Sequence, residues 1–136
     1  MAIRLKVRLE FENKKIEAVG LANAGYETDT EEILLPASLF KKYWKGKGKE
    51  VRYLTADGQV TTLKHIGKCK TKIITKDKTS KEVIAELLVS AGGEEVILSD
   101  ALLQSLGIIL VKLKDGKWCF ENEDIERESE TIQRYT

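Results

Sequence analysis

The 136-residue sequence has few of the residue types that build metal or thiol chemistry. It contains one histidine, His65, and two cysteines, Cys69 and Cys119, whereas a structural zinc site usually takes four Cys or His ligands. We therefore expect no metal centre, and no motif indicates a cofactor. In a reducing compartment, the two cysteines are expected to serve as ordinary small apolar side chains.

Long apolar runs are also missing. No stretch approaches the ~18 residues of a membrane-spanning helix. Residues 1–15 alternate apolar and charged side chains and lack the apolar centre of a signal peptide. We therefore expect a cytoplasmic protein that does not enter a membrane.

An excess of charge of either sign is lacking as well. Lys and Arg number 23 and Asp and Glu number 22, for a net charge of +1, so no overall field attracts nucleic acid. Lys and Glu dominate the charged residues, while Asn, Gln, Cys and Met are few. That mixture is reported for proteins of hyperthermophiles, so we expect a thermophilic source.

What is present is a pattern of short strands. Residues 3–11 alternate strictly between apolar and charged side chains, which predicts a half-buried strand. Similar short apolar stretches separated by Gly and Asp-Gly turns predict further strands at 16–22, 33–35, 50–55, 59–63, 66–75, 82–90, 95–98, 108–113 and 117–120. Many short strands with such turns favour an all-β fold, either a small barrel or a sandwich.

Two short helices interrupt the strands. Pro36 suits the first turn of a helix over 36–44, because its missing N–H costs nothing there. Ser99 and Asp100 look like capping residues for a second helix over 101–106, which Gly107 ends. We expect a barrel domain over 1–120 and a charged tail over 121–136, with a short helix over 124–133.

Three stretches in a fixed order resemble the retropepsin-like aspartic peptidases, the single-domain retroviral type with its cellular and archaeal relatives. The resemblance covers roughly residues 3 to 120. It implies a small closed barrel of retropepsin type, and a homodimer in which each chain supplies half of the active site and one hairpin flap. The stretches are Leu21-Ala22-Asn23-Ala24-Gly25 with Ile33-Leu34-Leu35-Pro36, then Thr55-Ala56-Asp57-Gly58, then Val96-Ile97-Leu98-Ser99-Asp100 with Leu106-Gly107-Ile108.

The family's catalytic triplet, Asp-Thr/Ser-Gly, is altered in this chain to Asn23-Ala24-Gly25. Two carboxyl groups roughly 3 Å apart share one proton, so that one acts as base and the other as acid. An amide has no proton to exchange in the useful range. The resemblance therefore implies a peptidase-like protein that is inactive as written. Its groove has Asn23, Ala24 and Gly25 as the floor and Thr55, Ala56, Asp57 and Gly58 as the flap, and could bind an extended peptide by strand addition.

Other interpretations stay open. Asn23-Ala24-Gly25 can be a plain surface turn, and the missing acid can be a natural loss or a substitution at position 23 that silences an active endopeptidase. Asp29 belongs to an acidic, solvated stretch. A structural or nucleic-acid-binding module is a further alternative, because evenly spaced lysines would share one sheet face, although the net charge argues against strong binding. These lysines are Lys64, Lys68, Lys70, Lys72 and Lys76.

Overall fold

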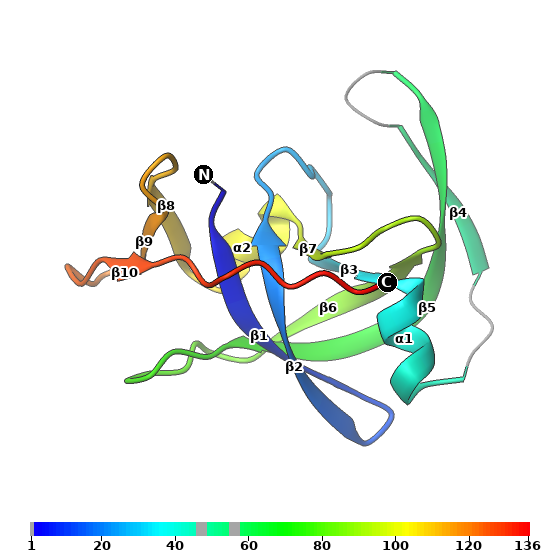
Figure 1. The fold of residues 1–136 in the computed structure, drawn as a ribbon, viewed down its shortest axis with the longest axis horizontal. Coiled ribbons are helices and arrows are strands. Elements are labelled where there is room, and N and C mark those ends of the chain that lie inside the picture. The colour runs from blue at the N-terminus through cyan, green and yellow to red at the C-terminus, as the bar shows by residue number, and fades with distance from the viewer. Residues whose placement is uncertain (1, 46–48, 55–57) are drawn as a thin grey trace.

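The computed structural model describes residues 2–45, 49–54 and 58–136, and these form ten strands and two short helices (Figure 1). The predicted flap residues Thr55, Ala56 and Asp57 lie outside the described residues. Neither helix is long enough to cross a membrane. In chain order the elements are β1 (Arg4–Phe11), β2 (Lys14–Ala22), β3 (Glu32–Pro36), α1 (Ala37–Tyr43), β4 (Lys49–Leu54), β5 (Val60–Ile73), β6 (Val83–Ser90), β7 (Val96–Leu98), α2 (Asp100–Ser105), β8 (Ile108–Lys112), β9 (Lys117–Phe120) and β10 (Arg127–Glu128).

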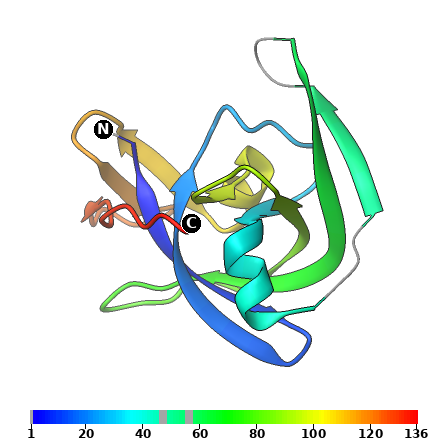
Figure 2. The same ribbon diagram turned by 45° about the vertical axis from the view of Figure 1, so that its right-hand side comes forward.

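Six strands close into a barrel. The main sheet has the order β1-β2-β7-β3-β6-β5-β4, and β5 pairs back onto β1, so that β4 alone lies outside the closed ring. Turning the molecule shows how β5 curves around the barrel and carries β4 away from it (Figure 2). The prediction of a small closed all-β barrel with two short helices is confirmed.

The alternating pattern of β1 explains how the barrel is filled. Leu5, Val7 and Leu9 on one face of β1 are at most 2% exposed. Each such buried side chain contributes about 1.5–3 kcal/mol relative to an exposed one. β1 pairs with β2 over its whole length and with β5 over part of it, so its inward residues form the centre of the core.

β5 is one strand of 14 residues, not the two strands predicted at 59–63 and 66–75. A bulge between His65 and Gly67 shifts its register against β6. Lys64 pairs with Val89 before the bulge, and Lys68 pairs with Glu86 after it. Because neighbouring residues of a strand alternate between faces, Lys64 shares the core-side face of Val89 while Lys68 lies on the opposite face. The prediction that all five lysines share one face is therefore wrong.

The C-terminal residues are extended. The helix predicted over 124–133 is absent, and β10 instead pairs with β9 in a small three-stranded sheet. The backbone groups of this segment bind other parts of the chain: the Ser129 N–H donates to the Gly116 carbonyl at 2.7 Å and the Glu130 N–H to the Arg4 carbonyl at 2.8 Å. These long-range bonds replace the local ones of a helix.

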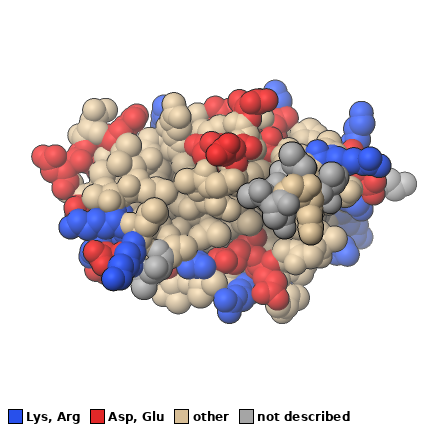
Figure 3. All heavy atoms as spheres, turned by 90° about the horizontal axis from the view of Figure 1, so that it is seen from above, with Lys and Arg blue, Asp and Glu red and all other residues tan. Residues whose placement is uncertain are grey.

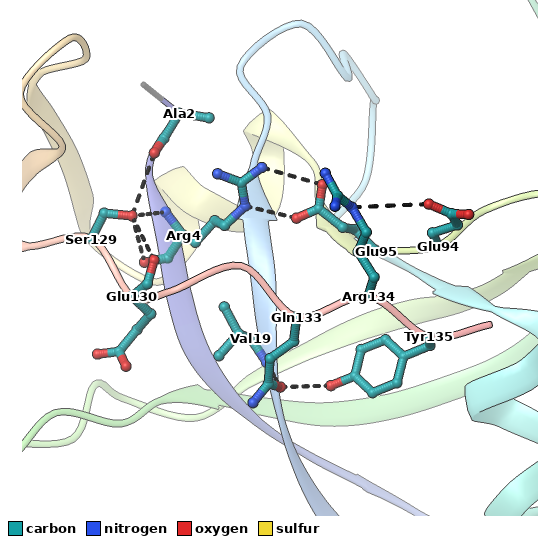
Figure 4. Close-up of polar contacts among 10 residues, drawn as sticks. All are labelled: Ala2, Arg4, Val19, Glu94, Glu95, Ser129, Glu130, Gln133, Arg134 and Tyr135. Carbon is teal, nitrogen blue, oxygen red and sulfur yellow. Dashed lines mark hydrogen bonds and ion pairs between the residues drawn. The ribbon is translucent and has the colours of Figure 1, made fainter.

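Residues 129–135, here called the strap, run across β1 and β2 (Figure 4). The Arg4 N–H donates to Ser129 Oγ at 2.7 Å, and the Val19 N–H donates to Gln133 Oε1 at 3.2 Å. At its end, the Tyr135 N–H donates to the Glu94 carbonyl at 2.6 Å. The strap therefore satisfies backbone groups of both strands that the barrel's own ladders leave open.

Candidate functional site

The site predicted from sequence lies where β2 ends. The parallel pair β2 and β7 places Ala22 opposite Leu98, and the Asn23 N–H donates to the Leu98 carbonyl at 3.3 Å. Asn23 Oδ1 accepts a hydrogen bond from the Gly25 N–H at 3.0 Å, and the Asn23 carbonyl accepts one from the Tyr26 N–H at 3.0 Å. The Asn23 side chain thus closes a tight turn on its own backbone.

An open groove of 640 Å³ lies beside this turn. Of the three residues predicted to form a floor, Asn23 and Gly25 line this groove, whereas Ala24 lies in a different hollow against α2 and β8. Gly58, with φ +84°, is exposed and is not among the groove's described lining residues. The remaining walls are mostly apolar and aromatic, and consist of Tyr26, Glu27, Leu34, Tyr53, Thr61, Leu63, Ser90 and Ile97.

Glu32, at the start of β3, connects two sides of the groove. Its side chain is 7% exposed, and its Oε1 accepts hydrogen bonds from the hydroxyl groups of both Tyr26 and Tyr53, each at 2.7 Å. Burial, followed by the hydrogen bond to Glu32, raises the pKa of both tyrosines far above the usual value. Tyr53 belongs to β4 and Tyr26 to the loop after β2, so Glu32 ties the β4–β5 hairpin to the site loop.

The sequence prediction missed this role of Glu32. Glu32 lies at the end of an acidic stretch, and the sequence predicts that this stretch is exposed to solvent. The signal that could have found it is its position: Glu32 directly precedes the apolar residues Ile33 to Leu35, so it begins a buried strand. A carboxyl group there needs polar partners, because burying one without hydrogen bonds is costly.

Residues at the start of α2 form hydrogen bonds to the same loop and to the start of β3. Ser99 is fully buried, and its Oγ accepts hydrogen bonds from the Leu102 N–H at 3.2 Å and from the Glu32 N–H at 3.1 Å. The predicted cap at Ser99 is therefore confirmed. Asp100 adds a second tie, since its Oδ1 accepts from the Thr28 N–H at 3.0 Å.

The other titratable groups do not assemble a catalytic pair in the described part of the groove. Asp29 is exposed, and the Glu31 carboxylate accepts a hydrogen bond from Ser105, which lowers its pKa. Cys69 lies in the core, where burial and then the charge of Glu86 raise the pKa of its thiol to about 12. Within the described residues no group of three His, Cys, Asp or Glu side chains could hold a metal ion.

Among solved structures, the retroviral protease-like domain of Ddi1 from Leishmania major is similar, with a TM-score of 0.54 over 96% of this chain and 97% of that chain. The fold is retropepsin-like. Sequence identity is 10%, so the likeness concerns the fold alone. No protein-family model and no curated protein sequence matches the chain.

Ala24 belongs to a second surface of this retropepsin-like barrel. The hollow that it lines has a volume of 270 Å³ and is shared with Leu103 of α2 and with Ile109 and Leu110 of β8. The neighbouring residues of β8 and its turn are unusually exposed for large apolar side chains: Ile109 is 46%, Val111 40% and Leu113 58% exposed. We call Ala24 and these three residues the β8 surface, and within it Ile109 lines the same hollow as Ala24.

Proposed function

We propose that this protein is an aspartic-peptidase-like homodimer that binds an extended peptide and does not cleave it. The observation that supports this most directly is the turn at residues 23–25 in a retropepsin-like fold, because the resemblance implies that the family's catalytic triplet occupies these positions and Asn23 carries an amide. Asn23 can neither accept nor release a proton near neutral pH. It also uses its Oδ1 to hold the Gly25 N–H.

Among the described residues, Glu27 is the one carboxyl group that lines the groove, and it is exposed. Glu32 is the nearest buried acid to the groove walls described above, but its Oε1 already accepts two tyrosine hydroxyl groups and its Oε2 lies 3.4 Å from the Thr30 hydroxyl. A general base needs a free lone pair within reach of the attacking water. The described residues of the groove thus include one exposed carboxyl group and no pair of carboxyl groups, which supports a groove that binds without cleaving.

The shape of the groove supports peptide binding. Leu34, Leu63 and Ile97 give it apolar walls, and Tyr26 and Tyr53 add aromatic rings whose centroids are 6.4 Å apart. β4 is the last strand of the main sheet, and no described strand pairs with its outer edge, to which an extended peptide can add as a further strand. Seen from above, neither acidic nor basic side chains form a continuous field on this face (Figure 3), which favours a peptide of mixed or apolar side chains.

The β8 surface supports the dimer. In the resemblance described above, a single chain has only half of the site, and the two halves meet across a two-fold axis. Ala24 of the site loop lines one hollow with the exposed residue Ile109, and Val111 and Leu113 farther along β8 and its turn are further exposed apolar residues that a second copy would cover.

Binding of nucleic acid by the lysines of β5 is less well supported. Lys68 pairs across the sheet with Glu86, and Lys70 pairs with Glu10 on β1, so acidic groups interrupt the basic ones on that face, although Lys72 pairs with Arg8. Lys64 lies on the other face of the strand. A continuous basic surface is therefore not formed by the described residues of this face.

The proposal is tested by restoring the acid. Asn23→Asp, alone and combined with Ala24→Thr, is assayed beside the unchanged chain for cleavage of an unfolded protein at acidic to neutral pH, with and without pepstatin. We expect the unchanged chain to be inactive and to bind peptides, measured by calorimetry with a library of extended sequences.

Each outcome separates the alternatives. Pepstatin-sensitive cleavage by a restored variant alone indicates a peptidase that was silenced at position 23, and inactivity of both variants indicates a long-standing loss. Cleavage by the unchanged chain contradicts the proposal.

A further inference from the structure

A second cavity lies on the far side of β5 from the groove, between α1 and the strands β4, β5 and β6. Its volume is 470 Å³, within the range of about 300–1,000 Å³ typical of small-molecule sites. The described lining residues of this cavity and of the peptide groove do not overlap. Nothing in the proposed peptidase-like function uses it.

The floor of this cavity is apolar and held in place. Phe40 and Trp44 of the α1 region are 5% and 4% exposed, and their ring centroids lie 5.5 Å apart. Trp44 Nε1–H donates to the Phe11 carbonyl at 2.9 Å, so the one polar group of the indole is already satisfied. Val89 and Ile66 complete the floor. An apolar chain can lie here without displacing a hydrogen bond, and the rings lose little freedom when it binds.

The rim of the cavity is basic. Among the described residues, Lys41, Lys45 and Lys64 line it with a single acidic residue, Glu50, which lies opposite Lys64 across β4 and β5. None of the three lysines forms an ion pair with another described residue. Lys64 reaches this side only because the bulge at His65–Gly67 puts it on the face of Val89 instead of the face of Lys68. Three exposed cations around a closed apolar floor are complementary to a ligand with one apolar chain and one anionic end.

We propose that this cavity binds a medium-chain carboxylate, with the hydrocarbon chain against Phe40, Trp44 and Val89 and the carboxylate among Lys41, Lys45 and Lys64. A compact cavity of this volume fits a chain of this kind better than a folded protein segment. A peptide that ends in an acidic residue shares the charge but would need to spread beyond the cavity.

The test uses the full chain and sodium dodecanoate below its micelle-forming concentration. Calorimetry should give saturable binding of one ligand per chain, and amide NMR shifts should concentrate at Ala37, Thr62 and Ala91, which line the cavity, with little change at Tyr26 and Leu34 of the groove. Dodecyltrimethylammonium, which has the same chain and a cationic end, should bind at least tenfold more weakly.

Single substitutions of the lysines test how much each positive charge contributes to dodecanoate binding. Lys41→Glu and Lys64→Glu should each weaken dodecanoate binding by about fivefold, as expected for an exposed charge contact. Lys42→Glu is the control, because Lys42 shares the last turn of α1 with Lys41 but does not line the cavity. Ala91→Trp should block binding by filling the entrance of the cavity without changing the charge. This variant tests the proposal if a charge-reversed chain fails to fold.

Several results would overturn the proposal. These are no saturable binding of dodecanoate, equal affinity for the cationic analogue, shifts centred on the groove, or an effect of Lys42→Glu as large as that of Lys41→Glu. Tighter binding of an acidic peptide than of dodecanoate would assign the cavity to a protein partner instead.

Discussion

At the scale of single residues, the hydroxyl groups of Tyr26 and Tyr53 meet on one oxygen of the buried Glu32. Both tyrosines have strongly raised pKa values, so the folded chain retains two protons that an unfolded chain releases above about pH 10. Stability from these groups is therefore complete below about pH 10 and falls as the pH rises from there toward the folded-state values.

Tyr53→Phe should remove one of the two hydroxyl protons that the folded chain retains at alkaline pH, and one hydrogen bond to a carboxyl group. We expect a loss of about 1–2 kcal/mol of unfolding free energy at pH 7 and a shallower further loss above pH 10. Urea unfolding at several pH values measures both, and absorbance of tyrosinate follows the titration. Tyr43→Phe, at an exposed position, is the control. Equal alkaline slopes in Tyr53→Phe and the unchanged chain would contradict the expectation.

At the scale of secondary-structure elements, Ser99 joins α2 to β3 by accepting from the Leu102 and Glu32 N–H groups. Ser99→Ala removes the cap and leaves a buried donor unsatisfied, so we expect a loss of about 2–3 kcal/mol. Ser38→Ala is a matched control, because Ser38 Oγ is buried without a hydrogen-bond partner among the described residues, and its removal should change stability by less than about 0.5 kcal/mol. Urea midpoints compare the two, and similar losses in both variants would show that the cap contributes little.

At the scale of the whole molecule, the β8 surface should decide the oligomeric state. We expect the unchanged chain to sediment as a dimer, and Ile109→Lys to weaken dimerisation by at least about tenfold, because a charge would be buried against the partner. Ile125→Lys is the control, since Ile125 is also exposed, at 56%, but lies in the C-terminal segment. A chain that sediments as a monomer at tens of micromolar would contradict the homodimer.

How much the sequence predicts depends on whether the determining contacts are local. Strict alternation in β1 and the Ser99 cap are local patterns, and both are confirmed. The continuity of β5 depends on its register with β6 across a bulge, which the sequence pattern does not show, and the prediction of two strands at 59–63 and 66–75 is therefore wrong.

Long-range contacts account for the other differences. Residues 124–133 are extended because the backbone of Ser129 and Glu130 binds Gly116 and Arg4, and the Gln133 side chain accepts from the Val19 N–H. These partners are far away in the sequence. The hydrogen bond from Tyr53 to Glu32 joins β4 to β3, and the spacing of these residues in the sequence does not predict it. In the candidate site, the position of Asn23 and Gly25 in the groove follows from the strand that precedes them, whereas the placement of Ala24 against β8 depends on tertiary packing.

The strap has a consequence for how the chain is made. Residues 129–135 leave the ribosome after every strand of the barrel, yet they satisfy the backbone of β1 at Arg4 and of β2 at Val19. During synthesis, these backbone groups of the β1–β2 hairpin therefore lack their hydrogen-bond partners until the strap has been made. Unpaired backbone groups of a strand are a template for pairing with other chains. A nascent or truncated chain that ends before residue 129 should be the species most exposed to co-translational aggregation and most in need of a chaperone.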